Sequence, residues 1–356
     1  MTRKKIHLRT IGGAVAATTM SALLAACGGT SGSASASATV TTGSTVSSAK
    51  PSANITIAEP LQSFGYLPLY IAQKEGYFTK RGLNVKIQTM DTSASGFVDA
   101  VLNGSVWGDI GGPEHDAYAN AKGAQLRSVA NVVNVSNNYL VARKGVNTSL
   151  PLAQQLKGQK IAVSFYGGTP NVDLRYWLNS IGLTPGKDVT LVESAASTYF
   201  AAVKSGQVNY VVTSDPQLSQ GAIEGIWTQP IFDFAKWFGP YTYSTINVPQ
   251  KTITNDPSQV ANFVAAIAEA DNTALTNPAV SLKVAEEVFV GASPQILKAS
   301  YQRAVADKMW AKNALQTDAA FQTDVKAITE VGTYQGPPIN PSSVIDNQFL
   351  EVTNAG

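Results

Sequence analysis

The sequence of 356 residues contains a single cysteine, Cys27, and two histidines, His7 and His115. One cysteine excludes an intramolecular disulfide bond and a zinc site built from several cysteines. Only His115 lies beyond the amino-terminal segment, so a Ser–His–Asp triad would have to use it. The G-x-S-x-G, H-E-x-x-H and Walker sequences are also absent. These absences predict a chain that is not an enzyme and carries no metal or cofactor.

Charged side chains are also scarce, at 14% of the sequence, against about 25% in an ordinary soluble protein. The formal net charge is +2, but four of the 26 basic residues and none of the 24 acidic ones precede Cys27. The remainder has 22 basic and 24 acidic residues, a net charge of −2. This balance excludes the basic surface that nucleic-acid binding requires. The 44% hydrophobic content supports a large packed core, and the length suggests roughly two domains.

The amino terminus has the pattern of a targeting segment. A basic stretch precedes a mostly apolar run from Ile11 to Ala26, which is shorter than the ~20 residues that a membrane-spanning helix needs. Leu24-Ala25-Ala26-Cys27 resembles the lipobox of bacterial lipoproteins. We therefore expect residues 1–26 to be a signal peptide, Cys27 to be lipidated, and the Gly/Ser-rich residues 27–53 to form a flexible tether. The alternative is an ordinary signal peptide with an incidental cysteine.

From Asn54 onward, short apolar segments alternate with amphipathic ones, which indicates α/β architecture with mainly parallel sheets. The final third, about 256–331, is almost entirely helical in pattern, with helix starts expected at Asp256-Pro257 and Ser293-Pro294. The expected strands are 55–59, 84–88, 107–111, 127–133, 138–143, 160–165, 189–193 and 208–213, and the helices between them lie near 68–75, 95–103, 113–121, 170–181, 197–205 and 216–224.

Two successive α/β units followed by helices predict two lobes, with the chain returning to the first. We place lobe one at 54–143 plus 240–352, and lobe two at 144–239. Ligands of open α/β sheets bind beyond the carboxyl ends of the strands. Two such ends facing each other would form a cleft between the lobes.

Several segments resemble one family of solute-binding proteins. PLYIAQKEGYF (68–78) and the following KRGLNV resemble the opening of ABC-transporter solute-binding proteins of the nitrate/sulfonate/taurine and thiamine-pyrimidine type. Segments 98–112, 156–170, 180–193 and 201–216 follow in the family's order. The resemblance implies a type II periplasmic-binding fold, in which two α/β lobes joined by a two-strand hinge close on one small molecule.

The sequence departs from the family pattern near the expected cleft. GSVWGDIGG is about two residues longer than usual, with Trp107 inserted. Where the family often has Gly-Ser or Gly-Thr after the second-lobe strand, this chain has Gly168-Thr169-Pro170. Because both departures lie near the expected cleft, they affect the prediction of the ligand class more than the prediction of the fold.

Candidate ligand contacts follow the predicted strands. The glycine-flanked segment 164–170 opens a helix, and a helix start can hold an oxyanion through its N–H groups; a plain strand-to-helix turn is the alternative. Aromatic residues beside glycine at 63–66 favour a pocket wall over a core position. Asp215 is either a ligand contact or a helix cap. The expected ligand-binding residues are Ser63, Phe64, Tyr66, Gly112, Glu114, Asn138, Phe165, Tyr166, Gly168, Thr169, Asp215 and Tyr241.

Glu114-His115-Asp116 resembles a metal-ligand cluster, but three consecutive helical residues cannot all face one ion. A polar helix start, with acids favoured by the helix dipole, is the first interpretation. A ligand contact by Glu114 is the second.

Together these features predict a monomeric, lipid-anchored receptor on the outer face of the cytoplasmic membrane or in the periplasm. It would bind a small organic anion such as a sulfonate, taurine or nitrate and deliver it to an ABC permease. The alternatives are a receptor for a thiamine-precursor pyrimidine or another heteroaromatic, and a ligand-sensing module for a signalling partner. We expect no nucleic-acid partner.

Overall fold

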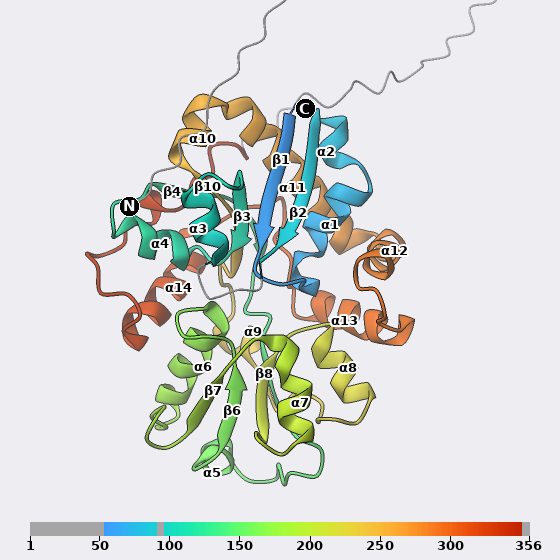
Figure 1. The fold of residues 1–356 in the computed structure, drawn as a ribbon, viewed down its shortest axis with the longest axis vertical. Helices are drawn as coiled ribbons and strands as arrows, with labels where there is room; N and C mark the ends of the chain where they lie inside the picture. Colours follow the sequence, from blue (N-terminus) through green and yellow to red (C-terminus); the bar gives the residue numbers. More distant parts are fainter. Residues whose placement is uncertain (1–52, 91–95, 351–356) are drawn as a thin grey trace, which may run out of the picture. The chain divides into compact units, whose positions relative to one another are not determined.

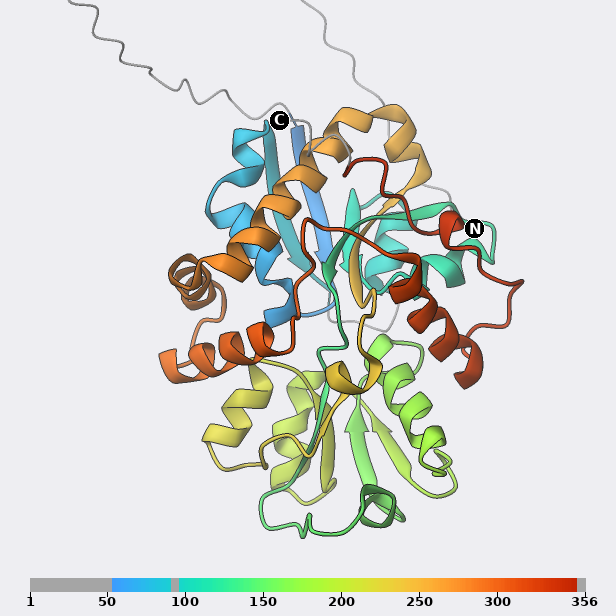
Figure 2. The same cartoon turned by 180° about the vertical axis from the view of Figure 1, so that it is seen from behind.

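The computed structural model describes residues 53–90 and 96–350. The predicted signal peptide, the lipidated Cys27 and nearly all of the tether therefore lie outside the described residues. Figures 1 and 2 show the described chain as two α/β units, each built around its own sheet and connected by extended segments. Within this part of the chain, no helix is both long and apolar enough to span a bilayer.

The first sheet has the strand order β2-β1-β3-β10-β4. Strand β1 pairs in parallel with β2 and β3, whereas β10 runs antiparallel to β3 and β4. Its strands are β1 (Ala53–Glu59), β2 (Leu83–Thr89), β3 (Gly108–Gly111), β4 (Leu126–Val133) and β10 (Ser244–Pro249).

The second sheet repeats this plan in the order β7-β6-β8-β5-β9. Strand β6 pairs in parallel with β7 and β8, and β5 runs antiparallel to β8 and β9. Every residue of β5 and β8 is buried, as expected for a sheet covered on both faces. The strands are β5 (Tyr139–Ala142), β6 (Lys160–Val163), β7 (Thr190–Glu193), β8 (Tyr210–Thr213) and β9 (Phe232–Asp233).

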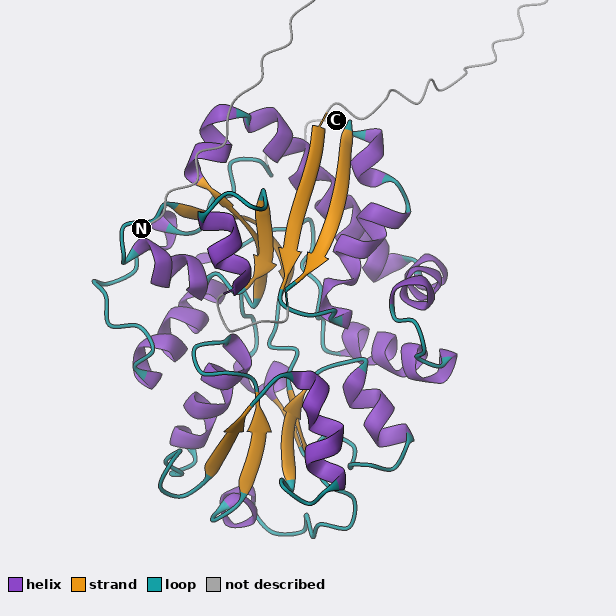
Figure 3. Cartoon of the chain, viewed as in Figure 1, coloured by secondary structure: helices purple, strands orange, loops and turns teal. Residues whose placement is uncertain are grey.

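Helices cover both sheets (Figure 3). The helices before residue 239 include the six that were expected between strands and three short ones that were not. They are α1 (Leu67–Lys74), α2 (Tyr77–Lys80), α3 (Gly96–Leu102), α4 (Glu114–Asn120), α5 (Leu152–Leu156), α6 (Thr169–Ser180), α7 (Tyr199–Lys204), α8 (Gln217–Ile223) and α9 (Phe234–Phe238), with 3-10 turns η1 (Phe64–Tyr66) and η2 (Ala196–Thr198). The three unexpected ones are α2, α5 and α9.

The final third is helical, as predicted. The helices are α10 (Gln250–Asn255), α11 (Pro257–Thr276), α12 (Pro278–Val288), α13 (Pro294–Ala306) and α14 (Asp318–Val331), followed by η3 (Pro341–Ser343). The two expected starts are confirmed, because Asp256 accepts from the N–H of Gln259 and Ser293 from that of Ile296. These side chains satisfy N–H groups that a helix start leaves unpaired.

The chain crosses between the two sheets twice. The first crossing, residues 134–138, joins β4 to β5, and the second, residues 239–243, leads from α9 to β10. The crossings run side by side (Figure 2), and the N–H of Tyr241 donates to the carbonyl of Asn134 at 2.9 Å. We call the part of the chain around the first sheet lobe one and that around the second sheet lobe two.

The strand pairing differs from the expected arrangement at two places. Residues 138–143 were assigned to lobe one, but β5 pairs with β8 and β9 and so lies in lobe two. Strand β10, in the interior of the first sheet, was not predicted, and neither was the short β9. Each sheet therefore carries an antiparallel strand beside its parallel ones.

Candidate functional site

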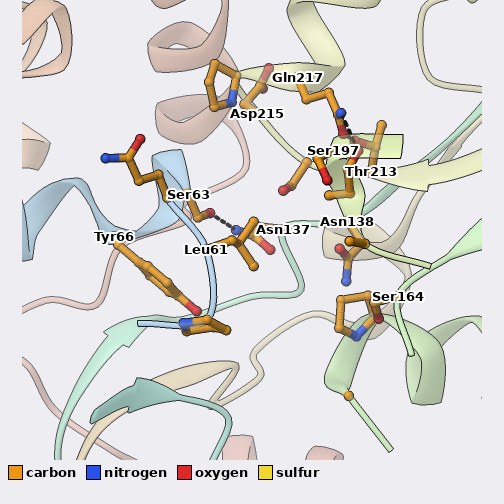
Figure 4. Close-up of a pocket in the computed structure, with 18 of the residues that line it drawn as sticks. Leu61, Ser63, Tyr66, Asn137, Asn138, Ser164, Ser197, Thr213, Asp215 and Gln217 are labelled. Carbon is orange, nitrogen blue, oxygen red and sulfur yellow. Dashed lines mark hydrogen bonds between the residues drawn. The ribbon is translucent and has the colours of Figure 1, made fainter. Parts of the chain in front are cut away.

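A cavity of about 820 Å³ lies between the lobes, at the carboxyl ends of the parallel strands. Lobe one contributes the loops after β1 and β3, and lobe two contributes the loops after β6, β7 and β8. Figure 4 shows side chains from both lobes, and from the first crossing, converging on this space. The volume lies within the range of about 300–1,000 Å³ that small-molecule sites occupy.

The lobe-one wall is held by a short hydrogen-bond network. Ser63 caps η1, because its Oγ accepts from the N–H of Gly65 at 3.2 Å. The same Oγ accepts from Asn137 Nδ2 at 3.3 Å, which joins the wall to the first crossing (Figure 4). Tyr66 and Gly112 line the same side of the cavity. The prediction that these loops form a wall therefore agrees with the geometry.

The lobe-two wall is rich in hydroxyl and amide groups. Ser164, Gly168 and Thr169 follow β6, and Ser197 follows β7. At the end of β8, Thr213 Oγ1 donates to Gln217 Oε1 at 2.8 Å (Figure 4). Such groups can both donate and accept, so they suit a polar ligand of either charge.

Aromatic rings line the cavity from both lobes. Phe165 is 41% exposed, which places an apolar surface at the cavity rather than in the core. The rings that line the cavity are those of Tyr66, Phe97, Phe165, Tyr199, Phe200, Tyr243 and Phe289. An organic ligand with an apolar body would contact several of these rings.

Basic side chains are missing from the wall. Among the described residues that line the cavity there is no lysine or arginine, and His115 is the one residue with a basic ring. Burial disfavours the charged imidazolium, but the nearby carboxylates of Glu114 and Asp109 outweigh this and raise the pKa of His115. No group of three or more acidic or histidine side chains within 53–90 and 96–350 could hold a metal ion.

Asp215 lines the cavity but is already paired. Its Oδ1 accepts from the N–H and Oγ of Ser219 at 3.0 and 2.6 Å, and from Ser300 Oγ at 3.1 Å. Its Oδ2 accepts from Arg303 Nε at 2.9 Å. Ser300 and Arg303 belong to α13 of lobe one, so Asp215 connects the lobes at this edge.

Four of the predicted ligand contacts do not line the cavity. Phe64 is fully buried and stacks on Phe289 at 5.6 Å, in the core of lobe one. Tyr166 is 51% exposed, with the Arg175 guanidinium 5.0 Å from its ring centroid. Glu114 and Tyr241 are fully buried behind the wall. The other eight predicted residues line the cavity, and their contact with ligand stays a prediction.

Glu114 makes another side-chain contact between the lobes. Its Oε1 accepts a hydrogen bond from Thr169 Oγ1 at the start of α6, and lies 3.3 Å from His115 Nδ1. Its Oε2 is buried without a partner. A side chain at Gly112 would collide with this carboxylate unless Glu114 moved. Because the Thr169 hydroxyl donates its one proton to Glu114, it has none to donate to a ligand in this structure.

The start of α6 offers few free donors. Pro170 has no N–H, and the N–H groups of Asn171 and Val172 both donate to the carbonyl of Gly168. The N–H of Gly168 donates to the carbonyl of Phe165. An oxyanion here would rely on the Thr169 N–H and on hydroxyl and amide side chains.

Sequence reasoning missed several wall residues. Ser194, Ser197, Thr213 and Gln217 line the cavity from the loops after β7 and β8. The available signal was their position, since residues directly after parallel strands of an open α/β sheet face the ligand side. That rule was applied to the segment after β6 and to Asp215 after β8, but not to these four residues.

Two lobes that enclose such a cavity at their strand ends, joined by paired crossings, define the periplasmic binding fold. Residues 63–281 match the family described as NMT1/THI5 like, so the chain belongs to that family. The fold and family predictions are thereby confirmed.

Individual relatives agree with this assignment. YtlA of Bacillus subtilis is 28% identical over 255 residues, covering 70% of this chain and 75% of its own. The bicarbonate-binding protein CmpA of Synechococcus elongatus is 26% identical over 201 residues, covering 50% of this chain and 44% of its own. This chain thus spans less than half the length of CmpA.

A solved structure shows the same fold. The alkanesulfonate-binding protein SsuA of Xanthomonas axonopodis, bound to MOPS, superimposes with a TM-score of 0.68 at 18% identity. The match covers 84% of this chain and 100% of that one. CmpA and SsuA are named as binding proteins, in line with the expectation that this chain is a receptor.

Proposed function

We propose that this chain is the extracytoplasmic solute-binding component of an ABC importer, which closes its lobes on a small organic anion and delivers it to the permease. One observation carries the proposal: a cavity of ligand size lies at the strand ends of both lobes, and both lobes line it. Closure would bury the ligand through contacts that exist only in the closed form.

The ligand class rests on the relatives and on the lining. CmpA is named for bicarbonate and SsuA for alkanesulfonates. The hydroxyl and amide groups of the wall can donate to oxyanion oxygens, and His115 lies among them. The aromatic rings favour an anion that carries an apolar body, such as an organic sulfonate or carboxylate, over a bare inorganic ion.

A second candidate is a heteroaromatic ligand such as a thiamine-precursor pyrimidine. Two observations favour it: the described part of the wall has no lysine or arginine, and Glu114 takes the Thr169 hydroxyl. A buried carboxylate at the start of α6 opposes an anion there. It would favour a ligand that presents hydrogen-bond donors.

A thermal-shift panel separates these ligand classes. It contains short alkanesulfonates, taurine, nitrate, simple carboxylates and hydroxymethylpyrimidine. A ligand at 100 times its dissociation constant stabilises the folded state by about 2.7 kcal/mol. At this chain length that raises the unfolding midpoint by several degrees. We expect a sulfonate or carboxylate to produce the shift.

Two variants identify the group responsible. If an anion binds beside Thr169, Glu114→Gln leaves its affinity unchanged or raises it, because a nearby negative charge is removed. Thr169→Val then weakens binding, because such an anion would take the hydroxyl proton that Glu114 accepts in this structure. If the pyrimidine instead displaces Thr169 and donates to Glu114, which lies behind the wall, Glu114→Gln abolishes its shift and Thr169→Val has little effect. A shift from the pyrimidine alone would overturn the anion assignment, and no shift from any compound would count against the whole panel of ligand classes.

We further propose that Cys27 anchors the receptor to the membrane, with residues 28–53 as its tether. Leu24-Ala25-Ala26-Cys27 and the Gly/Ser-rich composition that follows support this. A diacylglyceryl group would supply two acyl chains at about 0.8 kcal/mol per buried CH₂, which is enough for stable attachment.

Cys27→Ala should therefore move the protein from the membrane fraction to the soluble fraction of intact cells. Its unfolding midpoint should not change, because the substitution precedes the folded body. Cell fractionation with immunodetection measures the first effect, and thermal unfolding the second. Wild-type protein found in the soluble fraction would contradict the anchor.

A further inference from the structure

Two buried carboxyl groups meet one tyrosine hydroxyl where the lobes join. Asp173 lies on α6 of lobe two, Asp324 on α14 of lobe one, and Tyr241 on the second crossing. All three residues are fully buried. The Tyr241 hydroxyl lies 3.1 Å from Asp173 Oδ1 and 3.1 Å from Asp324 Oδ1.

The single hydroxyl proton of Tyr241 cannot serve two ionised carboxylates at once. A tyrosine hydroxyl has one proton, so it can donate to only one of the two carboxyl groups. If both were ionised, the other would face the hydroxyl oxygen without a proton between them. One carboxyl group must therefore carry a proton and donate it to Tyr241.

The remaining contacts decide which group is ionised. Asp173 Oδ2 also accepts from Ser136 Oγ at 2.5 Å and from Asn138 Nδ2 at 3.3 Å, so Asp173 has three donors. Asp324 Oδ2 has no partner. Donors stabilise an ionised carboxylate, whereas a neutral acid tolerates an unpaired carbonyl oxygen better.

We propose that Asp324 holds a proton and donates it to Tyr241, that Tyr241 donates to ionised Asp173, and that this relay positions Asn138 in the cavity wall. Asn138 Nδ2 donates to Asp173 Oδ2 and, at 2.8 Å, to Tyr243 Oη. Its amide nitrogen is thereby used by the protein, which fixes the orientation of the amide. Asp173 and Asp324 are positioning residues for this wall, whichever ligand class binds.

The electrostatic surroundings agree with a bound proton. Burial raises the pKa of Asp324 well above its usual range and that of Asp173 to about 7. Glu114 of α4 acts on both carboxyl groups in the same direction. The other titratable or charged groups on the packed elements are His115, Asp116 and Tyr118 of α4, Tyr243 of the second crossing, Arg175 and Tyr176 of α6, and Asp318, Lys326 and Glu330 of α14. Arg175 pairs with Glu193, and Lys326 lies near Glu330.

The sign of the pH dependence follows. A carboxyl group whose pKa is higher in the folded state keeps a proton that the unfolded chain releases. Its stabilising contribution is complete below the unfolded pKa and is lost as pH rises through the folded value. Unfolding near neutral pH should therefore release this proton, and stability should fall as pH rises through neutrality.

Asp324→Asn tests the relay, because its amide replaces the protonated acid at nearly the same size and can donate to Tyr241. We expect calorimetric unfolding at about pH 7, in buffers of different ionisation enthalpy, to show about one proton fewer released than in the wild type. The infrared band of a protonated carboxylic acid should also be weaker in the folded variant. Asp324→Ala should instead be destabilised at every pH, because it removes the donor as well.

Asp318→Asn is the matched control, since it makes the same substitution at an exposed position on the same helix. It should release as many protons as the wild type. Equal proton release and equal carboxylic acid bands in wild type and Asp324→Asn would overturn the proposal. Neither readout requires a ligand, so this outcome is independent of the proposed function.

Discussion

Replacing Asp215 by alanine should lower the free energy of unfolding by about 3 kcal/mol or more, because it removes one partner of a buried ion pair. The Asp215 side chain is fully buried, and Arg303 is 20% exposed. The substitution also leaves the N–H and the hydroxyl of Ser219 without the acceptor that they share. Each unsatisfied buried donor adds about 1–3 kcal/mol. Chemical denaturation measures the loss.

The matched control is an exposed ion pair. Glu330→Ala breaks the contact with Lys326. The side chains of Glu330 and Lys326 are 55% and 64% exposed. Because solvent screens such pairs, it should produce no measurable change. A loss at Asp215 as small as that at Glu330 would contradict the assignment of Asp215 as a stabilising connection between α13 and lobe two.

Ser164→Trp should reduce ligand affinity by at least about 100-fold, equivalent to about 2.8 kcal/mol. Ser164 follows β6 and lines the cavity (Figure 4), and its Oγ has no hydrogen-bond partner. A tryptophan there occupies space that the ligand needs, while the fold loses no contact of the Oγ. Titration calorimetry with the compound that stabilises the wild type measures the affinity.

Ser164→Ala is the control at the same position, because it removes the hydroxyl and leaves the space open. Its affinity should stay within a few fold of the wild type. Both variants should unfold near the wild-type midpoint in the absence of ligand. Undiminished affinity in a folded Ser164→Trp variant would place the ligand outside this cavity.

Much of the fold could be predicted because strand and helix periodicities are local properties. The eight expected strands all occur, with ends shifted by a few residues. Strand β10 was missed because polar residues occupy its interior positions. Asn247 is fully buried, and its Nδ2 donates to Asp109 Oδ1 at 2.9 Å. Such a strand lacks the apolar run by which a buried strand is usually found.

The candidate site could be predicted only where position along a strand decides it. Ser63, Gly112 and Thr169 were found because they follow parallel strands. Phe64 was assigned to the cavity, but it packs on Phe289 and on Trp310, more than 220 residues away in sequence. Whether an aromatic ring after a strand turns inward depends on such distant partners.

The role of Glu114 shows the same limit. Its neighbours in sequence indicate a polar helix start, and the helix does begin at Glu114. Its hydrogen bond, however, comes from Thr169 in the other lobe. The sequence alone therefore left its contribution to ligand choice open.

Native mass spectrometry of the protein purified from its own host tests the central claim most directly. We predict that the wild type retains a small molecule in one-to-one ratio, that mild heating releases it, and that its fragmentation identifies an organic anion. Ser164→Trp, purified in parallel, should carry none. A folded wild type that stays without a bound molecule after exposure to host extract, or a molecule retained equally by Ser164→Trp, would contradict a receptor that binds its solute between the two lobes.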